Sequence, residues 1–186
     1  IRDYKVTGVQ TCALPISEVA HALGVPPEWI GGKAGIPPTT VQTVGDDSLR
    51  DLLVPIDTEE YLEEIDSDAS REKIRALSAK YNLAGLHLYA INSEGGIPDV
   101  HTRNFSPAVG IPEEAATGTL SGTLAYVLGG IKNLPWHGEV YFTFEQGMSM
   151  GSPSHIRVTL FTENGKVVRM QVGGKAEQTR EQPVSV

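Results

Sequence analysis

The stretch that decides the fold runs from Arg103 to Leu128 and reads R-N-F-S-P-A-V-G-I-P-E-E-A-A-T-G-T-L-S-G-T-L-A-Y-V-L. It begins with an extended segment that ends at Phe105. A turn-rich loop follows and carries two adjacent carboxylates, Glu113 and Glu114. After a short segment of small residues, the apolar run from Leu120 to Leu128 predicts a buried helix.

The start of this helix is a candidate anion site. Thr117 or Thr119 can act as the N-cap, and the first backbone N–H groups of a helix have no partner within it. Gly118 has no side chain and lets a ligand approach the main chain closely. Together with the positive end of the helix dipole, these groups suit a carboxylate or a phosphate.

The two acids beside this site allow two interpretations. Glu113 and Glu114 would repel a bound anion unless one of them were protonated, and a carboxyl held protonated near neutral pH is a candidate general acid or base. Alternatively, both acids complement the helix dipole and cap a buried helix that binds nothing. The residue types alone favour the second interpretation.

Two further blocks accompany this stretch: E-Q-G-M-S-M-G-S-P-S at 145–154 and V-G-G-K-A at 172–176. The three blocks resemble the signature of the PhzF-like (phenazine biosynthesis-like) family of isomerases and epimerases. The family patterns are R-x-F-x-P-x-x-G-x-x-E-D-P-A-T-G-S-A, E-Q-G-x-x-M-G-R-P-S and V-G-G-x-A. Because three blocks occur in order at plausible distances, the match is specific.

The resemblance implies an enzyme that moves a proton in a small carboxylic acid without a cofactor. Glu114 stands where the family has the Asp of its E-D-P-A-T-G motif and is the expected catalytic residue. Neither a metal site nor a nucleic-acid or membrane partner is expected, and the intact protein is expected to form a homodimer. The residues expected to bind substrate are Arg103, Thr117, Gly118, Thr119, Gln146 and Gly147.

Arg103 itself has two possible roles. Its guanidinium can hold the substrate carboxylate in a bidentate grip. It can equally form a salt bridge to Glu113 or Glu114. His101 alternates with Arg103 along a predicted strand, so both side chains are expected on the same side.

This sequence departs from the family pattern at three positions. Glu114 replaces Asp and is one methylene longer, Ala115 replaces Pro, and Leu120 replaces Ala. The longer acid still permits proton relay, while Leu120 indicates a tighter or shifted pocket. Related epimerases use a pair of cysteines, but the one cysteine here is Cys12, so thiol chemistry is not expected.

The resemblance covers about residues 17–176, which corresponds to the end of the family's first lobe and nearly all of its second. The family's G-N-P motif, its main catalytic Glu and its G-H-A-T segment are absent, which predicts an inactive fragment. An alternative is a non-catalytic lobe for anion binding or dimerisation. The predicted divisions are an adapter-like, non-native leader (1–16), a first-lobe remnant with connector (17–66) and the second lobe (67–186), with its central helix over about 117–128.

The pattern of elements predicts an α+β fold with a curved, mostly antiparallel sheet around the central helix, as in diaminopimelate epimerase, which PhzF-like proteins resemble. Helices are expected over 17–24, 57–65 and 70–81, with a break at Ser67-Asp68. The apolar helix is expected to end at Gly129-Gly130. Strands are expected over 41–44, 49–56, 86–91, 100–105, 140–144, 156–161 and 167–172. A turn is expected at 45–48, and Asn164-Gly165 predicts a hairpin turn because Asn-Gly favours the type I′ geometry.

Composition limits the function classes. The chain has 186 residues and a net charge of -8, which disfavours a nucleic-acid surface. No apolar run approaches the roughly 20 residues that span a bilayer. A single cysteine suits the reducing cytoplasm. The acids Glu59, Glu60, Glu63 and Glu64 are expected to form a solvated face rather than a metal site.

Overall fold

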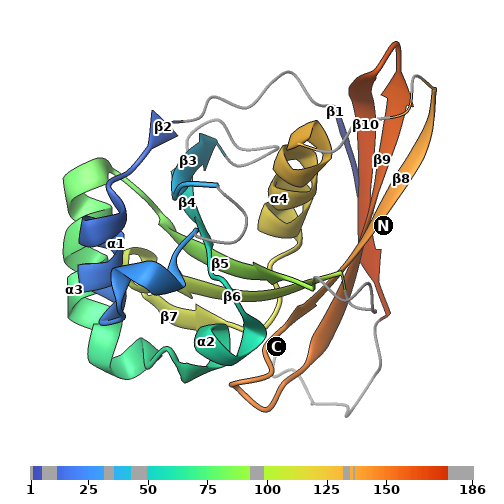
Figure 1. Cartoon of the computed structure of the whole chain (residues 1–186). Helices are drawn as coiled ribbons and strands as arrows, with labels where there is room; N and C mark the ends of the chain where they lie inside the picture. The colour runs from blue at the N-terminus through green and yellow to red at the C-terminus, as the bar shows by residue number, and fades with distance from the viewer. Residues whose placement is uncertain are drawn as a thin grey trace, which may run out of the picture.

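The protein is described by a computed structural model that covers residues 2–5, 12–31, 36–42, 50–92, 99–131, 135 and 137–175. Its ten strands form one sheet in the order β1-β10-β9-β8-β6-β5-β4-β3-β2, with β7 paired to β6 (Figure 1). The strand pairs β4–β5 and β6–β8 are parallel and the others are antiparallel. The α+β fold with a mostly antiparallel sheet is therefore confirmed.

The bounds of the elements are as follows. The strands are β1 Arg2–Lys5, β2 Cys12–Ala13, β3 Thr39–Gln42, β4 Arg50–Pro55, β5 Gly85–Ile91, β6 Val100–Ser106, β7 Ile111–Glu114, β8 His137–Gln146, β9 Ser154–Glu163 and β10 Lys166–Gly174. The α-helices are α1 Ile16–Leu23, α2 Glu59–Glu64, α3 Ser67–Tyr81 and α4 Gly118–Ile131, and short 3-10 turns span Pro27–Trp29 and Pro107–Val109.

The sheet separates two hydrophobic cores. On β5, Leu86 and Leu88 belong to the core beneath α1, α2 and α3, whereas Tyr89 belongs to the core around α4. Neighbouring residues of a strand point to opposite faces. We call the face toward α1, α2 and α3 the outer face and the face toward α4 the inner face.

Helix α4 lies in the hollow of the curved sheet, with β8, β9 and β10 on one side of it (Figure 1). Leu124 and Ala125 are fully buried there and belong to the same core as Phe144 and Leu160. At Gly122 an added Cβ would lie 2.9 Å from the sulfur of Met170 and 3.0 Å from a methyl carbon of Val172, so a larger residue would force these side chains to move. The expected enclosure of the apolar helix is confirmed.

The structure corrects the predicted helix ends. Helix α3 already begins at Ser67, because Asp66 caps it by accepting from the backbone N–H groups of Asp68 and Ala69. The predicted break at Ser67-Asp68 was therefore wrong. Helix α4 also continues through Gly129 and Gly130 to Ile131. Packing against the sheet outweighs the roughly 1 kcal/mol that each glycine costs a helix.

Three strands were not expected. Strand β7 carries Glu113 and Glu114, which had been placed in a loop. Strand β1 pairs with β10, and β2 pairs with β3, although 1–16 had been set aside as a non-native leader. The other strands match the predicted ones apart from their ends, and Asn164 and Gly165 have the positive φ of the expected hairpin turn, 51° and 70°.

The predicted turn at 45–48 and the tail from residue 176 lie outside the described residues. No helix in the described ranges has the length and apolar character needed to cross a membrane. The division into a lobe remnant and a second lobe stays a prediction.

Candidate functional site

Strand β7 brings the two adjacent acids to opposite faces of the sheet. Glu114 lies opposite Asn104 of β6, and α4 begins four residues later at Gly118. Because the side chains of a strand alternate, Glu113 is directed to the outer face and Glu114 to the inner face. The two carboxylates therefore have different partners and different roles.

On the outer face, Arg103 forms a buried ion pair with Glu113. Its Nε and Nη2 donate to the two oxygens of Glu113 at 2.8 and 3.0 Å. Its Nη1 donates to the carbonyl oxygens of Leu62 and Ile65 at 2.9 and 2.8 Å. Of the two roles considered for Arg103, the observed contacts are those of the salt bridge, and they tie the end of α2 to the sheet.

On the inner face, Glu114 is joined to the start of α4. Its Oε2 accepts from the hydroxyl of Thr117 at 2.7 Å and from Nδ2 of Asn104 at 3.4 Å. Its other oxygen, Oε1, has no hydrogen-bond partner among the described residues. Glu114 is half-buried, and its carboxylate is held in place through one oxygen only.

The side chain of Gln146, at the end of β8, forms hydrogen bonds to both Glu114 and Thr117. The side chain is 1% exposed, and its Nε2 donates to the carbonyl of Glu114 at 2.6 Å and to the hydroxyl of Thr117 at 3.0 Å. Its Oε1 accepts from the backbone N–H of Thr117 and the hydroxyl of Thr102, each at 3.3 Å. Gln146 therefore fixes the backbone between β7 and α4.

The helix start lies directly beside Glu114. The carbonyl of Thr117 accepts from the backbone N–H of Ser121 at 3.0 Å, which makes Thr117 the last residue before the helix. The next backbone N–H groups, those of Gly118 and Thr119, have no acceptor within the helix. Both residues are half-buried.

Gly147 has a structural role next to this site. Its φ is 85°, and an added Cβ would lie 2.4 Å from the carbonyl oxygen of Ser152 and 2.8 Å from that of Ala115. The hydroxyl of Ser154 also donates to the Ala115 carbonyl at 2.7 Å. The loop after β8 therefore packs tightly against the segment that leads into α4.

His87 and Asn104 form a buried polar pair behind Glu114 that was not expected from the sequence. His87 of β5 pairs in register with Asn104, and Asn104 pairs with Glu114. Nδ1 of His87 lies 3.3 Å from Oδ1 of Asn104, and because an amide oxygen only accepts, Nδ1 carries the proton. Burial lowers the pKa of His87 to about 4, so the imidazole is neutral at pH 7.

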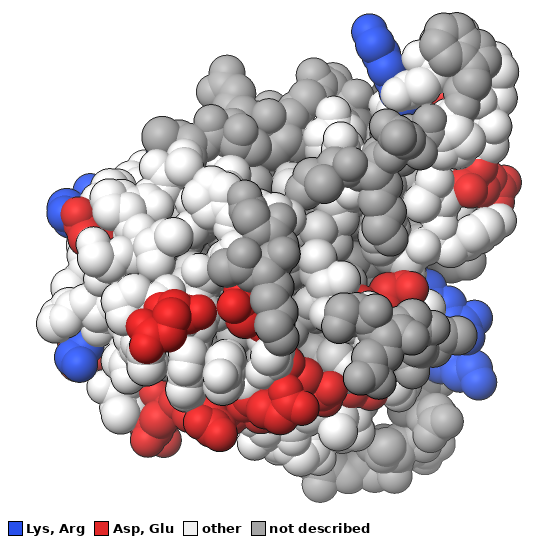
Figure 2. All heavy atoms as spheres, in the orientation of Figure 1, with Lys and Arg blue, Asp and Glu red and all other residues white. Residues whose placement is uncertain are grey.

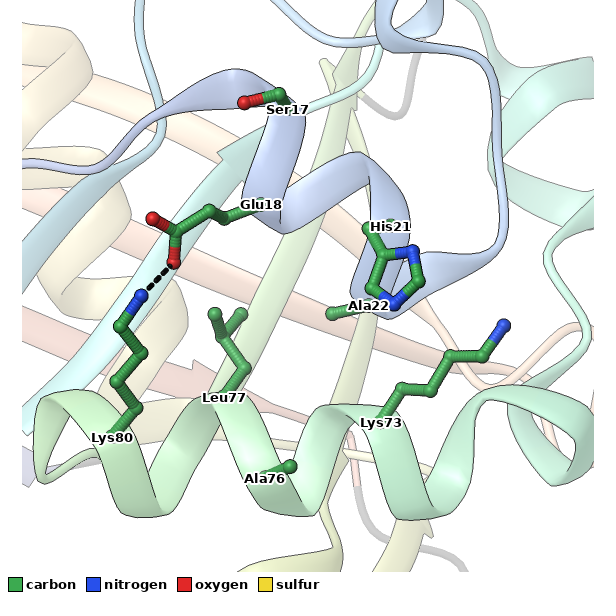
Figure 3. Close-up of a pocket in the computed structure, with 8 residues that line it drawn as sticks. All are labelled: Ser17, Glu18, His21, Ala22, Lys73, Ala76, Leu77 and Lys80. Atoms are coloured by element: carbon green, nitrogen blue, oxygen red, sulfur yellow. Dashed lines mark hydrogen bonds and ion pairs between the residues drawn. The ribbon is translucent and has the colours of Figure 1, made fainter.

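A groove on the outer side of the molecule is separate from this site. It lies between α1 and α3, and Figure 3 shows the ion pair of Glu18 and Lys80 at one end of it. The lining residues are Ser17, Glu18, His21, Ala22, Lys73, Ala76, Leu77 and Lys80. None of the predicted site residues lines this groove.

Comparison with known proteins gives a consistent assignment. The family model described as phenazine biosynthesis-like protein (PhzC-PhzF) matches residues 9–182. A relative in Deinococcus radiodurans, described as an uncharacterized isomerase, is 30% identical over 165 residues, which are 88% of this chain and 50% of the relative. The chain therefore spans about half the length of the curated relatives it matches.

Solved structures show the same fold. A phenazine biosynthesis protein of the PhzF family from Bacillus anthracis superposes with a TM-score of 0.75 at 19% identity, over 92% of this chain and 56% of the other. A protein of Pseudomonas aeruginosa described as a predicted epimerase gives a TM-score of 0.56 at 20% identity, over 96% of this chain and 57% of the other.

Proposed function

Since this chain belongs to the family of phenazine biosynthesis-like proteins, we propose that it supplies half of the active site of a cofactor-free isomerase, which moves a proton in a small carboxylic acid. The observation that carries the proposal is the position of Glu114. One oxygen of this carboxylate is held by Thr117 at the start of an enclosed helix, and the other has no hydrogen-bond partner among the residues that the structure describes.

The proposed substrate binds through its carboxylate. The backbone N–H groups of Gly118 and Thr119 and the hydroxyl of Thr119 offer donors at the positive end of α4, where an anion is stabilised. Arg103 takes no direct part, because its guanidinium is engaged by Glu113 and by α2. Gln146 and Gly147 act by holding the segment before α4 in place.

Glu114 is the proposed proton carrier. A substrate bound at Gly118 and Thr119 lies beside Oε1, the carboxylate oxygen without a partner in the described part of the chain. A carboxyl group at this position can pass a proton to the substrate and take one back. Asn104 and Thr117 keep Oε2 fixed while Oε1 exchanges the proton.

We further propose that turnover needs groups that this sequence does not provide. The chain matches half of its curated relative in Deinococcus radiodurans, and the resemblance places the main catalytic Glu in a first lobe that the sequence lacks. The chain as given then binds a small carboxylate without exchanging its protons.

Two measurements test the proposal. The chain is fused behind the first half of the Deinococcus relative, and deuterium incorporation from heavy water into small carboxylic acids is followed by NMR. We expect exchange in the fusion, a loss of at least tenfold with Glu114→Gln, and no exchange in the chain alone. Exchange at an equal rate in the Glu114→Gln fusion contradicts the role of Glu114.

A non-catalytic anion-binding protein is the second candidate. The observation in its favour is the longer side chain of Glu114 at a position where the family motif has Asp. The fusion with Glu114 would then bind small carboxylates but show no deuterium exchange, whereas the Glu114→Asp fusion would show exchange. This pair of results would identify the given sequence as a binding protein.

A further inference from the structure

The outer face carries a second group of titratable side chains, which the proposed reaction does not use. His101 of β6, Glu145 of β8 and His155 of β9 are neighbours in register across three adjacent strands. Glu59 approaches the same histidine from the first turn of α2. Because Gln146, the next residue of β8, points to the inner face, the group lies opposite Glu114.

Both ring nitrogens of His101 face carboxylates. Nε2 lies 3.2 Å from Oε2 of Glu59, and Nδ1 lies 3.3 Å from Oε2 of Glu145. The imidazole and the Glu145 side chain are only 12% and 14% exposed. A neutral imidazole carries one N–H and can donate to one carboxylate only. The second contact is satisfied either by a second proton on the ring or by a cation bound between the two groups.

The distance between each ring nitrogen of His101 and its carboxylate oxygen also fits two ligands of one metal ion. Two ligand atoms that are each about 2.1 Å from a tetrahedral zinc ion lie about 3.4 Å apart, close to the contacts of His101. Glu59, His101 and Glu145 each offer a ligand atom within 4.8 Å of the other two. Nδ1 of His155 lies 3.6 Å from the remaining oxygen of Glu145, which is too long for a hydrogen bond but within reach of a shared cation.

We propose that Glu59, His101, Glu145 and His155 bind one divalent transition-metal ion, such as Zn²⁺. One ring nitrogen of His101 binds the ion together with the carboxylate beside it. The other nitrogen donates to one oxygen of the second carboxylate, which reaches the ion through its remaining oxygen, and this hydrogen bond fixes the tautomer as in many metal sites. Two imidazoles beside two carboxylates favour a transition metal over Mg²⁺ or Ca²⁺, which prefer oxygen ligands.

The surrounding charge supports cation binding. Figure 2 shows acidic side chains gathered in a band over α2, where Glu59, Glu60, Glu63 and Glu64 are exposed. From the sequence alone these four acids are expected to form a solvated face rather than a metal site. The fold brings His101 of β6 to Glu59, and a bound ion would join α2 to the sheet.

The test uses the full chain after treatment with EDTA. Zn²⁺ is titrated by calorimetry, and Co²⁺ is titrated by absorbance, which reports ligand number. We expect one ion per chain, a rise in melting temperature with Zn²⁺, and little effect of Mg²⁺. We also expect His101→Gln to abolish binding and Glu59→Gln and Glu145→Gln to weaken it at least tenfold.

Matched controls keep the outcome decisive. Glu64→Gln removes an exposed acid of the same helix, and His21→Gln removes an exposed histidine elsewhere, so both should bind Zn²⁺ as the wild type does. Half of the Glu59 side chain is exposed, so Glu59→Gln should fold even if His101→Gln does not. No saturable Zn²⁺ binding, or equal binding by the Glu59→Gln and Glu64→Gln variants, overturns the proposal.

Discussion

The hydroxyl of Thr117 donates a 2.7 Å hydrogen bond to Oε2 of Glu114, so the residue before α4 and the last residue of β7 hold each other. Thr117→Val removes this donor and leaves Gln146 without one of its acceptors. We expect a loss of about 1–2 kcal/mol in the free energy of unfolding, measured by urea denaturation. Thr117→Ser keeps the hydroxyl and should stay within about 0.5 kcal/mol of the wild type; an equal loss in both variants contradicts this account.

Gln146 should be among the polar residues whose loss is most costly. Gln146→Leu leaves the buried N–H of Thr117 without its acceptor and the carbonyl of Glu114 without its donor. We expect a loss of about 3 kcal/mol in the free energy of unfolding. Gln171→Leu on β10 is the matched control, since Gln171 is only half-buried. A change at Gln146 no larger than at Gln171 would show that the connection between β8 and α4 is unimportant.

Arg103 distinguishes a structural ion pair from a substrate ligand. Arg103→Met leaves the carboxylate of Glu113 buried without its partner and should cost about 3–5 kcal/mol of stability. The double variant with Glu113→Gln should lose less than the sum of the two single variants. If the Arg103→Met protein is as stable as the wild type but binds carboxylates more weakly, the structural role is wrong and Arg103 is a substrate ligand.

His87 should make stability sensitive to acid. Its pKa is lowered by burial from 6.5 to about 4, so the unfolded chain takes up a proton at a higher pH than the folded chain. The free energy of unfolding is therefore highest above pH 6.5, and it falls by about 3 kcal/mol as the pH is lowered toward 4. His87→Gln keeps a donor for Asn104 but does not titrate, so its unfolding free energy should fall less over this range. Parallel pH curves for the two proteins would refute the assignment.

The elements that sequence analysis predicted well have strong local signals. The apolar run at Leu120–Leu128 predicted an enclosed helix, and Asn164-Gly165 predicted its hairpin turn, because these patterns depend on neighbouring residues alone. The end of α4 was missed because Gly129 and Gly130 stop a helix only where packing does not hold it. Strand β7 was missed because Pro112 and two acids are poor strand formers, and its pairing with β6 is a tertiary contact.

The candidate site could be predicted only where it depends on residues close together in the sequence. The motif around Glu114 indicated a carboxylate beside a helix start, which the structure shows. The partner of Arg103 could not be decided, because two adjacent acids look alike until strand β7 sends them to opposite faces. His87 and Asn104 belong to different strands, and only their register brings them behind Glu114.

The central claim is that a small carboxylate binds at the start of α4 beside Glu114. The most direct test follows the backbone amide signals of Gly118 and Thr119 in a ¹⁵N–¹H spectrum while lactate is added to the full chain. Lactamide, which has nearly the same shape without the charge, is the control. We predict saturable shifts at these two amides with lactate, no shifts with lactamide, and altered affinity in Glu114→Gln. Unchanged signals at Gly118 and Thr119 with lactate at high concentration would contradict the claim.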